Sequence, residues 1–137
     1  MRHRSRARAW ALRTLYAWEA RDGTPLEGVL EEFLTGRRVA AERRAYLRRL
    51  VGTVAEHRDA IDAALQESIR NWRVERLSVI DRNVLRIGAA ELMYFRDIPP
   101  RVTIREALRL AERYGTDQSP RFVNGVLDAL MRRLGRE

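Results

Sequence analysis

Basic side chains at the start of the chain are the residues best suited to bind a ligand. Arginine occupies every second position from Arg2 to Arg8, and the first acidic residue after this run is Glu19. Cations at a helix start are unfavourable by roughly 0.3–1 kcal/mol each at low salt, because the helix dipole is positive there. A bound anion would reverse this penalty by meeting guanidinium and free N–H groups together. The pattern predicts phosphate binding, and a solvated basic tail is the alternative; the arginines are Arg2, Arg4, Arg6 and Arg8.

Two aromatic side chains close to this run could add base stacking to phosphate contacts. On a helical wheel, Trp10 lies opposite the apolar stripe of its segment and Tyr16 lies at the margin of that stripe. Single-stranded nucleic acids stack their bases on exposed rings that lie beside arginine. Packing of the two rings against a neighbouring helix explains their positions equally well, so both interpretations stay open.

Candidate catalytic and metal-ligating residues are few. His3 and His57 lie far apart in the chain, neither has a partner at metal-ligand spacing, and cysteine is absent. Arginines at helical spacing accompany the many carboxylates, which is typical of surface ion pairs. We therefore expect no enzymatic activity, no cofactor and no metal site.

The most apolar helix, predicted from Leu77 to Phe95, carries charged residues that need an explanation. Asp81 fits a capping pattern in the first turn, whereas Arg82 and Arg86 are expected on the outer face. Glu91 lies beside the apolar stripe, where it either pairs with an arginine of a neighbouring helix or marks a stripe left open for a partner protein. We favour the internal pair.

The dipeptide Asn124-Gly125 is typical of a hairpin turn, yet apolar residues continue at helical spacing on both sides of it. We therefore place it inside a last helix that begins at Ser119. Glycine there costs about 1 kcal/mol relative to alanine. The expected reason is close packing against another helix backbone, either at Gly88 or at a small residue of the first helix.

Composition fits a basic globular protein of one domain that covers residues 1–137. Its 27 basic residues, all arginine, exceed the 19 acidic ones and give a net charge of +8, while 45% of residues are hydrophobic. The excess favours a polyanionic partner, and nucleic acid is the commonest one for a small basic protein. The absence of cysteine and of an uncharged span of ~20 residues favours a cytoplasmic protein outside the membrane.

Apolar residues repeat at helical spacing along the whole chain, without the alternation typical of strands. Serine or threonine followed by an acid three residues later marks three helix starts, at Thr24, Ser78 and Thr103. We predict an all-α fold of about seven helices. The expected ranges are 5–21, 25–34, 77–95, 104–114 and 119–134, with two more helices between 40 and 71 that are separated near His57.

Three segments of the chain form a recognisable series. They read "RARAWALRTLYAWE", "WRVERLSVIDRNVLRIGAAELMYFRDIPPRVTIREALRLAERYG" and "RFVNGVLDAL". In this order they resemble the NusB family of bacterial transcription antitermination factors. The resemblance implies two small helical bundles packed together and a partner, the ribosomal protein that doubles as NusE. It further implies binding of the single-stranded boxA element in nascent ribosomal RNA, within an antitermination complex that helps RNA polymerase pass terminators.

The resemblance also implies site residues, because the family's RNA site uses the arginine-rich N-terminus, an aromatic residue of the first helix and the start of the last helix. The matching positions here, with Arg2 from the same basic run, are Arg2, Arg4, Arg6, Arg8, Tyr16, Gln118, Arg121 and Phe122. The surface for NusE would involve Asp81, Arg82 and Arg86. Gln118 stands where the family often has an acid, which leaves the RNA contact there undefined.

Two other functions stay open at this point. NusB-like domains also occur fused to ribosomal RNA methyltransferases, so the chain could target or assist such an enzyme. It could instead be a protein adaptor whose basic end does not bind RNA. A homodimer is a further option that the sequence does not decide.

Overall fold

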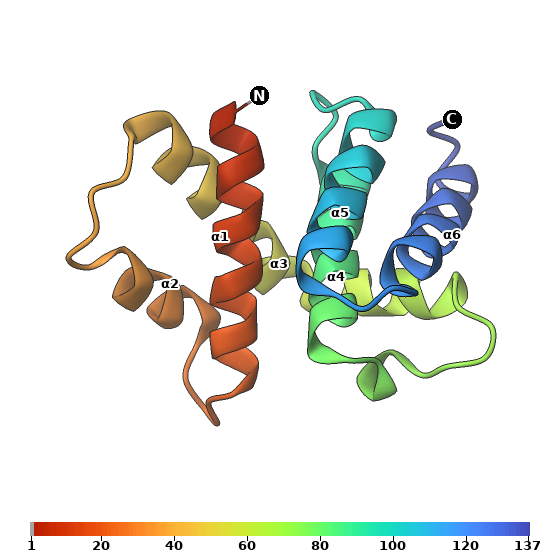
Figure 1. Ribbon diagram of the computed structural model, residues 1–137, viewed down its shortest axis with the longest axis horizontal. Helices are drawn as coiled ribbons and strands as arrows, with labels where there is room; N and C mark the ends of the chain where they lie inside the picture. Colours follow the sequence, from red (N-terminus) through yellow and green to blue (C-terminus); the bar gives the residue numbers. More distant parts are fainter. Residues whose placement is uncertain (1) are drawn as a thin grey trace.

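The computed structural model describes residues 2–137, and within that range it consists of helices without strands (Figure 1). The elements are α1 (Arg2–Glu19), α2 (Leu26–Leu34), α3 (Ala41–Glu67), the short 3-10 turn η1 (Val74–Arg76), α4 (Val79–Tyr94), α5 (Pro100–Tyr114) and α6 (Ser119–Arg133). Figure 1 shows α1 and α2 on one side and α4, α5 and α6 on the other. The all-α prediction of two packed bundles is confirmed. None of these helices is long and apolar enough to cross a bilayer.

Helix α3 belongs to both bundles and bends at His57. The backbone there has φ −116° and ψ 22°, far from the −63° and −42° of a regular α-helix. The His57 ring stacks on Tyr94 of α4, with 4.1 Å between the ring centroids. The break predicted near His57 is therefore present, and the two halves of α3 bring the number of helical segments to the expected seven.

Helix α4 is the centre of the fold, because it packs against α1, α3, α5 and α6. Every residue from Arg82 to Leu92 is buried. Gly88 permits the close approach of α6, since a Cβ at this position would lie only 2.6 Å from Cδ1 of Leu127. The last helix can pack this closely on α4 because residue 88 has no side chain.

The predicted close packing at Gly125 is wrong. Gly125 lies inside α6, as expected, but it is exposed and no atom of another segment lies within 4 Å of where its Cβ would be. The buried stripe of α6 contains Val123, Val126 and Leu127. At about 100° per residue, this stripe places position 125 on the opposite face, so the notch that the sequence suggests there belongs to Gly88.

One of the three predicted capping patterns is confirmed. The Ser78 hydroxyl accepts a hydrogen bond of 3.1 Å from the backbone N–H of Asp81, whereas α2 begins after Pro25 without a side-chain cap. Helix α5 begins at Pro100, about one turn before the predicted cap at Thr103, because proline is well suited to a first helical position. Thr103 therefore lies within α5, on its buried face.

Candidate nucleic-acid interface

One face of α1 carries the basic side chains that a nucleic acid could reach. Arg2, Arg6, Arg13 and Tyr16 lie on a single stripe, because residues three and four positions apart share a helix face. All four are exposed, and Tyr16 is 51% exposed. We call these four residues the α1 stripe. The site predicted from the sequence lacks Arg13, although its spacing of seven from Arg6 indicates the same face.

Arg4, also predicted to bind RNA, points away from this stripe toward the start of α3. Its guanidinium group lies 5.1 Å from the ring centroid of Tyr46, and its Nη2 atom is 3.7 Å from a carboxylate oxygen of Asp97. The Arg4 side chain is 41% exposed. A ligand could still reach Arg4, but it would compete with a weak surface ion pair.

Arg8 is buried, which argues against its predicted contact with RNA. Only 2% of the residue is exposed. Its Nε donates to Oε2 of Glu91 at 2.7 Å, and its Nη1 donates to Oε1 of Glu106 at 3.4 Å. Burial alone lowers the pKa of Arg8, but the hydrogen bond and charge of Glu91 raise it above the ordinary value. Arg8 therefore stays charged in the interior, and the internal pair expected for Glu91 is confirmed.

Hydroxyl groups complete a polar cluster around this ion pair. Tyr46 and Thr103 donate to Glu91 at 2.6 and 2.7 Å, and Ser5 donates to Glu106 at 2.5 Å. Burial, and next the charge of Glu91, raise the pKa of the Tyr46 phenol above its ordinary value, so it remains a donor. The cluster joins helices α1, α3, α4 and α5.

Arg82 and Arg86 are buried as well, and the expectation that they face outward is wrong. Both bind Glu19 at the end of α1, and Arg86 also makes two hydrogen bonds of 2.9 Å to Asp62 of α3. Burial alone raises the pKa of Glu19, but hydrogen bonds from Arg82 and Asn83 lower it overall. Helix α4 offers these arginines no solvent-exposed face, because other segments pack around it.

Residues predicted for two different roles line one pocket. The sequence assigns Asp81 to the protein partner and Gln118 and Phe122 to RNA, yet all three line a pocket of about 270 Å³ together with Trp72. We call it the α4–α6 pocket. Trp72 is 60% exposed and is absent from the predicted site. The Oδ1 atom of Asp81 is buried without a hydrogen-bond partner in residues 2–137, which is an unfavourable state unless a donor arrives.

The first turn of α6 contains the remaining predicted residue, Arg121, which is exposed. In the structure this turn does not adjoin the arginine-rich start of the chain. In Figure 1, α1 begins at the top of the molecule, whereas α6 begins lower down and on the other side of α5. The predicted RNA residues therefore form separate groups, on α1 and at the α4–α6 pocket, rather than one cluster.

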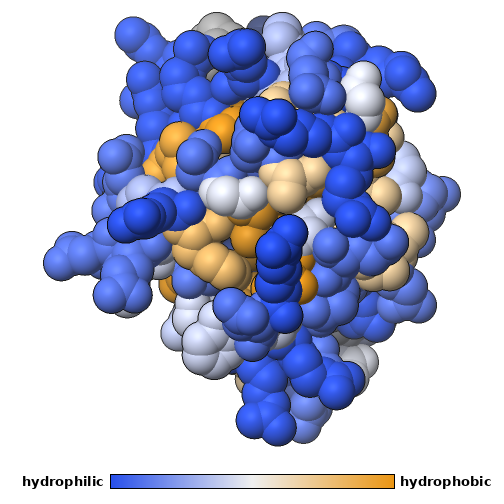
Figure 2. Space-filling model, turned by 90° about the vertical axis from the view of Figure 1, so that its right-hand side faces the viewer, coloured by the Kyte–Doolittle hydropathy of each residue, from blue (hydrophilic) through white to orange (hydrophobic). Residues whose placement is uncertain are grey.

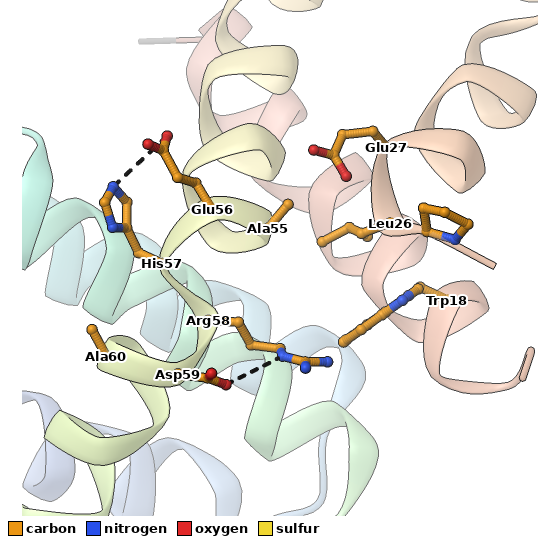
Figure 3. A pocket seen from close by; sticks show the side chains of 10 residues that line it. Trp18, Leu26, Glu27, Ala55, Glu56, His57, Arg58, Asp59 and Ala60 are labelled. Carbon is orange, nitrogen blue, oxygen red and sulfur yellow. Dashed lines mark ion pairs between the residues drawn. The ribbon is translucent and has the colours of Figure 1, made fainter. Parts of the chain in front are cut away.

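A separate cavity of about 370 Å³ lies at the bend of α3, and Figure 3 shows the side chains that line it. The His57 ring is 3.8 Å from the carboxylate of Glu56, and Arg58 lies over the ring of Trp18 at 5.3 Å. Glu56 and Arg58 are exposed. In the described part of the chain, no group of three or more acidic or histidine side chains could hold a metal ion. Long contacts in which one partner is exposed are typical of a solvated surface.

Comparison with known proteins places this arrangement in a family. The model of the NusB family matches residues 5–132. The chain belongs to the NusB family. It is 42% identical over 127 residues to the transcription antitermination protein NusB of Trichlorobacter lovleyi, over 93% of this chain and 89% of that protein. The corresponding NusB protein of Sorangium cellulosum is 44% identical over 133 residues, which are 97% of this chain and 94% of that protein.

Solved NusB structures share the fold. T. maritima NusB superposes with a TM-score of 0.89 at 39% identity, over 94% of this chain and 90% of that one. A chain from the crystal structure of antitermination factors NusB and NusE in complex with dsRNA gives a TM-score of 0.81 at 30% identity. That match covers 97% of this chain and 98% of the other. The NusB fold predicted from the three sequence segments is thereby confirmed.

Proposed function

We propose that this member of the NusB family is an RNA-binding transcription antitermination factor. In this proposal the chain pairs with NusE, binds boxA in nascent ribosomal RNA and helps RNA polymerase read through terminators in the cytoplasm, without catalysing a reaction itself. The α1 stripe is the observation that carries the proposal. Guanidinium groups bind phosphates through several donors, and the exposed ring of Tyr16 offers a stacking surface for a base.

The contrast between the stripe and the interior supports a ligand on α1. Arg8 has buried acidic partners, and the arginines of α4 have half-buried ones. The ion pairs within residues 2–137 do not include Arg2, Arg6 or Arg13, and the first turn of α1 contains no acid. The positive end of the helix therefore coincides with unpaired guanidinium groups, which is an arrangement that favours a bound phosphate.

For the protein partner, we propose the α4–α6 pocket. The Asp81 carboxylate there has an unpartnered oxygen that a donor from a basic ribosomal protein would satisfy. Trp72 and Phe122 add aromatic surface of the kind that dominates the energy of protein interfaces. Arg82 and Arg86 are buried, so we do not include them in the proposed surface for NusE. Since Gln118 lines the same pocket, RNA and NusE would meet there, which favours binding of both together.

A titration of fluorescent boxA RNA, with and without NusE and beside a scrambled sequence, tests the proposal. The variant Arg6→Gln/Arg13→Gln should weaken boxA binding roughly tenfold or more and reduce its salt dependence, because phosphate contacts are lost. Arg38→Gln/Arg44→Gln is the matched control, since it removes the same charge from exposed residues elsewhere. Equal losses in the two variants would contradict a site on α1. No RNA binding by the wild type, even with NusE, would favour the protein adaptor.

A further inference from the structure

Helix α5 carries a row of arginines that the proposed RNA site does not use. Arg101, Arg105, Arg109 and Arg113 recur every four residues, and all four are exposed. Successive members lie about 6 Å apart along the helix axis and are turned by about 40°. We call them the α5 row. It winds obliquely over the outer surface of the helix.

The two ends of the α5 row adjoin different parts of the molecule. Arg101 and Arg105 line a groove of about 470 Å³ between α5 and α6. On the α6 side of the molecule, Figure 2 shows apolar side chains gathered in a band with hydrophilic ones on both sides. Further along, Arg109 donates to Glu106 at 3.4 Å, and Glu106 accepts from Ser5 of α1. The row thus leads from the α6 side of α5 toward the helix that carries the α1 stripe.

Little in the fold neutralises this row. Arg101, Arg105 and Arg113 take part in none of the ion pairs of residues 2–137, and Arg109 is 66% exposed with a single long contact to a buried carboxylate. Three other acids lie close to the row: Glu112 on α5 itself, and Asp128 and Glu137 in the groove beside Arg101 and Arg105. Asp128 pairs with Arg132, and no ion pair within residues 2–137 joins Glu112 or Glu137 to the row. Like charges four residues apart destabilise a helix. The row therefore works against the stability of α5 unless a polyanion binds to it.

We infer that the α5 row is a second phosphate track, which holds single-stranded RNA that flanks the element bound at α1. The inference rests on the proposed RNA function. Guanidinium groups on long side chains recur about every 6 Å along α5, so successive arginines can follow the backbone of an extended single strand, as the positively charged grooves of single-strand binders do. The row offers guanidinium groups rather than a base pocket, so its contacts hold the backbone and carry no sequence information.

Two RNAs test the track: boxA alone, and boxA extended by a single-stranded oligouridine flank on either side. The wild type should bind the extended RNA, which carries a flank at both ends, roughly tenfold more tightly than boxA alone. The variant Arg101→Gln/Arg105→Gln/Arg109→Gln/Arg113→Gln should lose this gain while it binds boxA alone like the wild type. Its salt slope for the extended RNA should fall by roughly 2–3, at about 0.7 per phosphate on a single strand.

The control removes four exposed arginines elsewhere, Arg38, Arg44, Arg70 and Arg96, and should keep the gain from the flank. The inference is overturned by a wild type that binds both RNAs equally, by a row variant that keeps the gain, or by a control that loses as much. A row variant with unchanged RNA binding overturns the track and leaves an acidic protein surface as the other polyanion that the row could bind. A wild type that does not bind boxA at all would overturn the proposed function as well as the track.

Discussion

Replacement of Arg8 by methionine decides whether this arginine stabilises the fold or binds RNA. The change keeps a long unbranched side chain but removes the guanidinium group between Glu91 and Glu106. Loss of one partner from a buried ion pair costs about 3–5 kcal/mol, because the other charge stays in the interior. The lower end applies here, since the hydroxyl groups of Tyr46 and Thr103 still donate to Glu91. We expect the free energy of unfolding to fall by about 3 kcal/mol.

Urea denaturation followed by far-UV circular dichroism measures this loss, provided that the m value stays constant. Glu91→Gln and the double variant complete a double-mutant cycle with Arg8→Met. The double variant should lose less stability than the sum of the single variants, because removal of both charges leaves neither carboxylate nor guanidinium unpaired at this contact. A coupling energy near zero would mean that the two side chains do not interact.

RNA binding supplies the second readout for the same variant. Under conditions where Arg8→Met is still folded, its affinity for boxA should stay close to that of the wild type, because only 2% of Arg8 is exposed. Arg6→Gln should behave in the opposite way, with normal stability and weaker binding. An Arg8→Met protein with wild-type stability and a large loss of boxA affinity would refute the burial argument and return Arg8 to the RNA site.

Three further predictions concern the helices around α4. Gly125→Ala should stabilise the protein by about 0.5–1 kcal/mol, whereas Gly88→Ala should destabilise it by about 1–3 kcal/mol through overpacking. Thermal unfolding of the two variants measures this difference between the exposed glycine and the packed one. Hydrogen bonds from α4 lower the pKa of Glu19 despite burial, so the stability it contributes is present above about pH 4.5 and is lost as the pH falls through the lower folded value. Glu19→Gln should therefore be less stable at neutral pH and lose stability less steeply in acid, as measured by urea unfolding across that range. Trp72→Ala and Asp81→Ala should each weaken NusE binding roughly tenfold in a calorimetric titration, as loss of an interface hot spot does, and leave boxA binding without NusE nearly unchanged.

The helices and their order are predictable because apolar spacing repeats along the whole chain, and the break at His57 follows from a run too long for one helix. The same helical spacing also predicts that Arg8 is buried. It lies four residues before Leu12 and seven before Leu15, on the stripe that forms the core. Interpreting the arginines as one alternating run conceals this, since a helix separates neighbouring arginines onto different faces.

Other parts of the site depend on contacts that no local spacing contains. Glu19 lies 63 residues from Arg82, and Asp62 lies 24 residues from Arg86. Their pairing arises from the way α1 and α3 enclose α4, which is a property of the packed fold. Trp72 belongs to the connection before α4, where apolar periodicity gives no indication of exposure. Only the three-dimensional arrangement of the helices defines these positions.

The bend at His57 has a consequence for modularity. Helix α3 supplies its first half to the bundle of α1 and α2, and its second half to the bundle of α4, α5 and α6 (Figure 1). No flexible linker separates the two bundles, so cutting the chain between them would expose the apolar face of a severed helix, including Val54 and Ile61. The two bundles should therefore melt in a single transition. In the proposed function, RNA bound to one bundle would be held in a fixed orientation relative to a partner bound to the other.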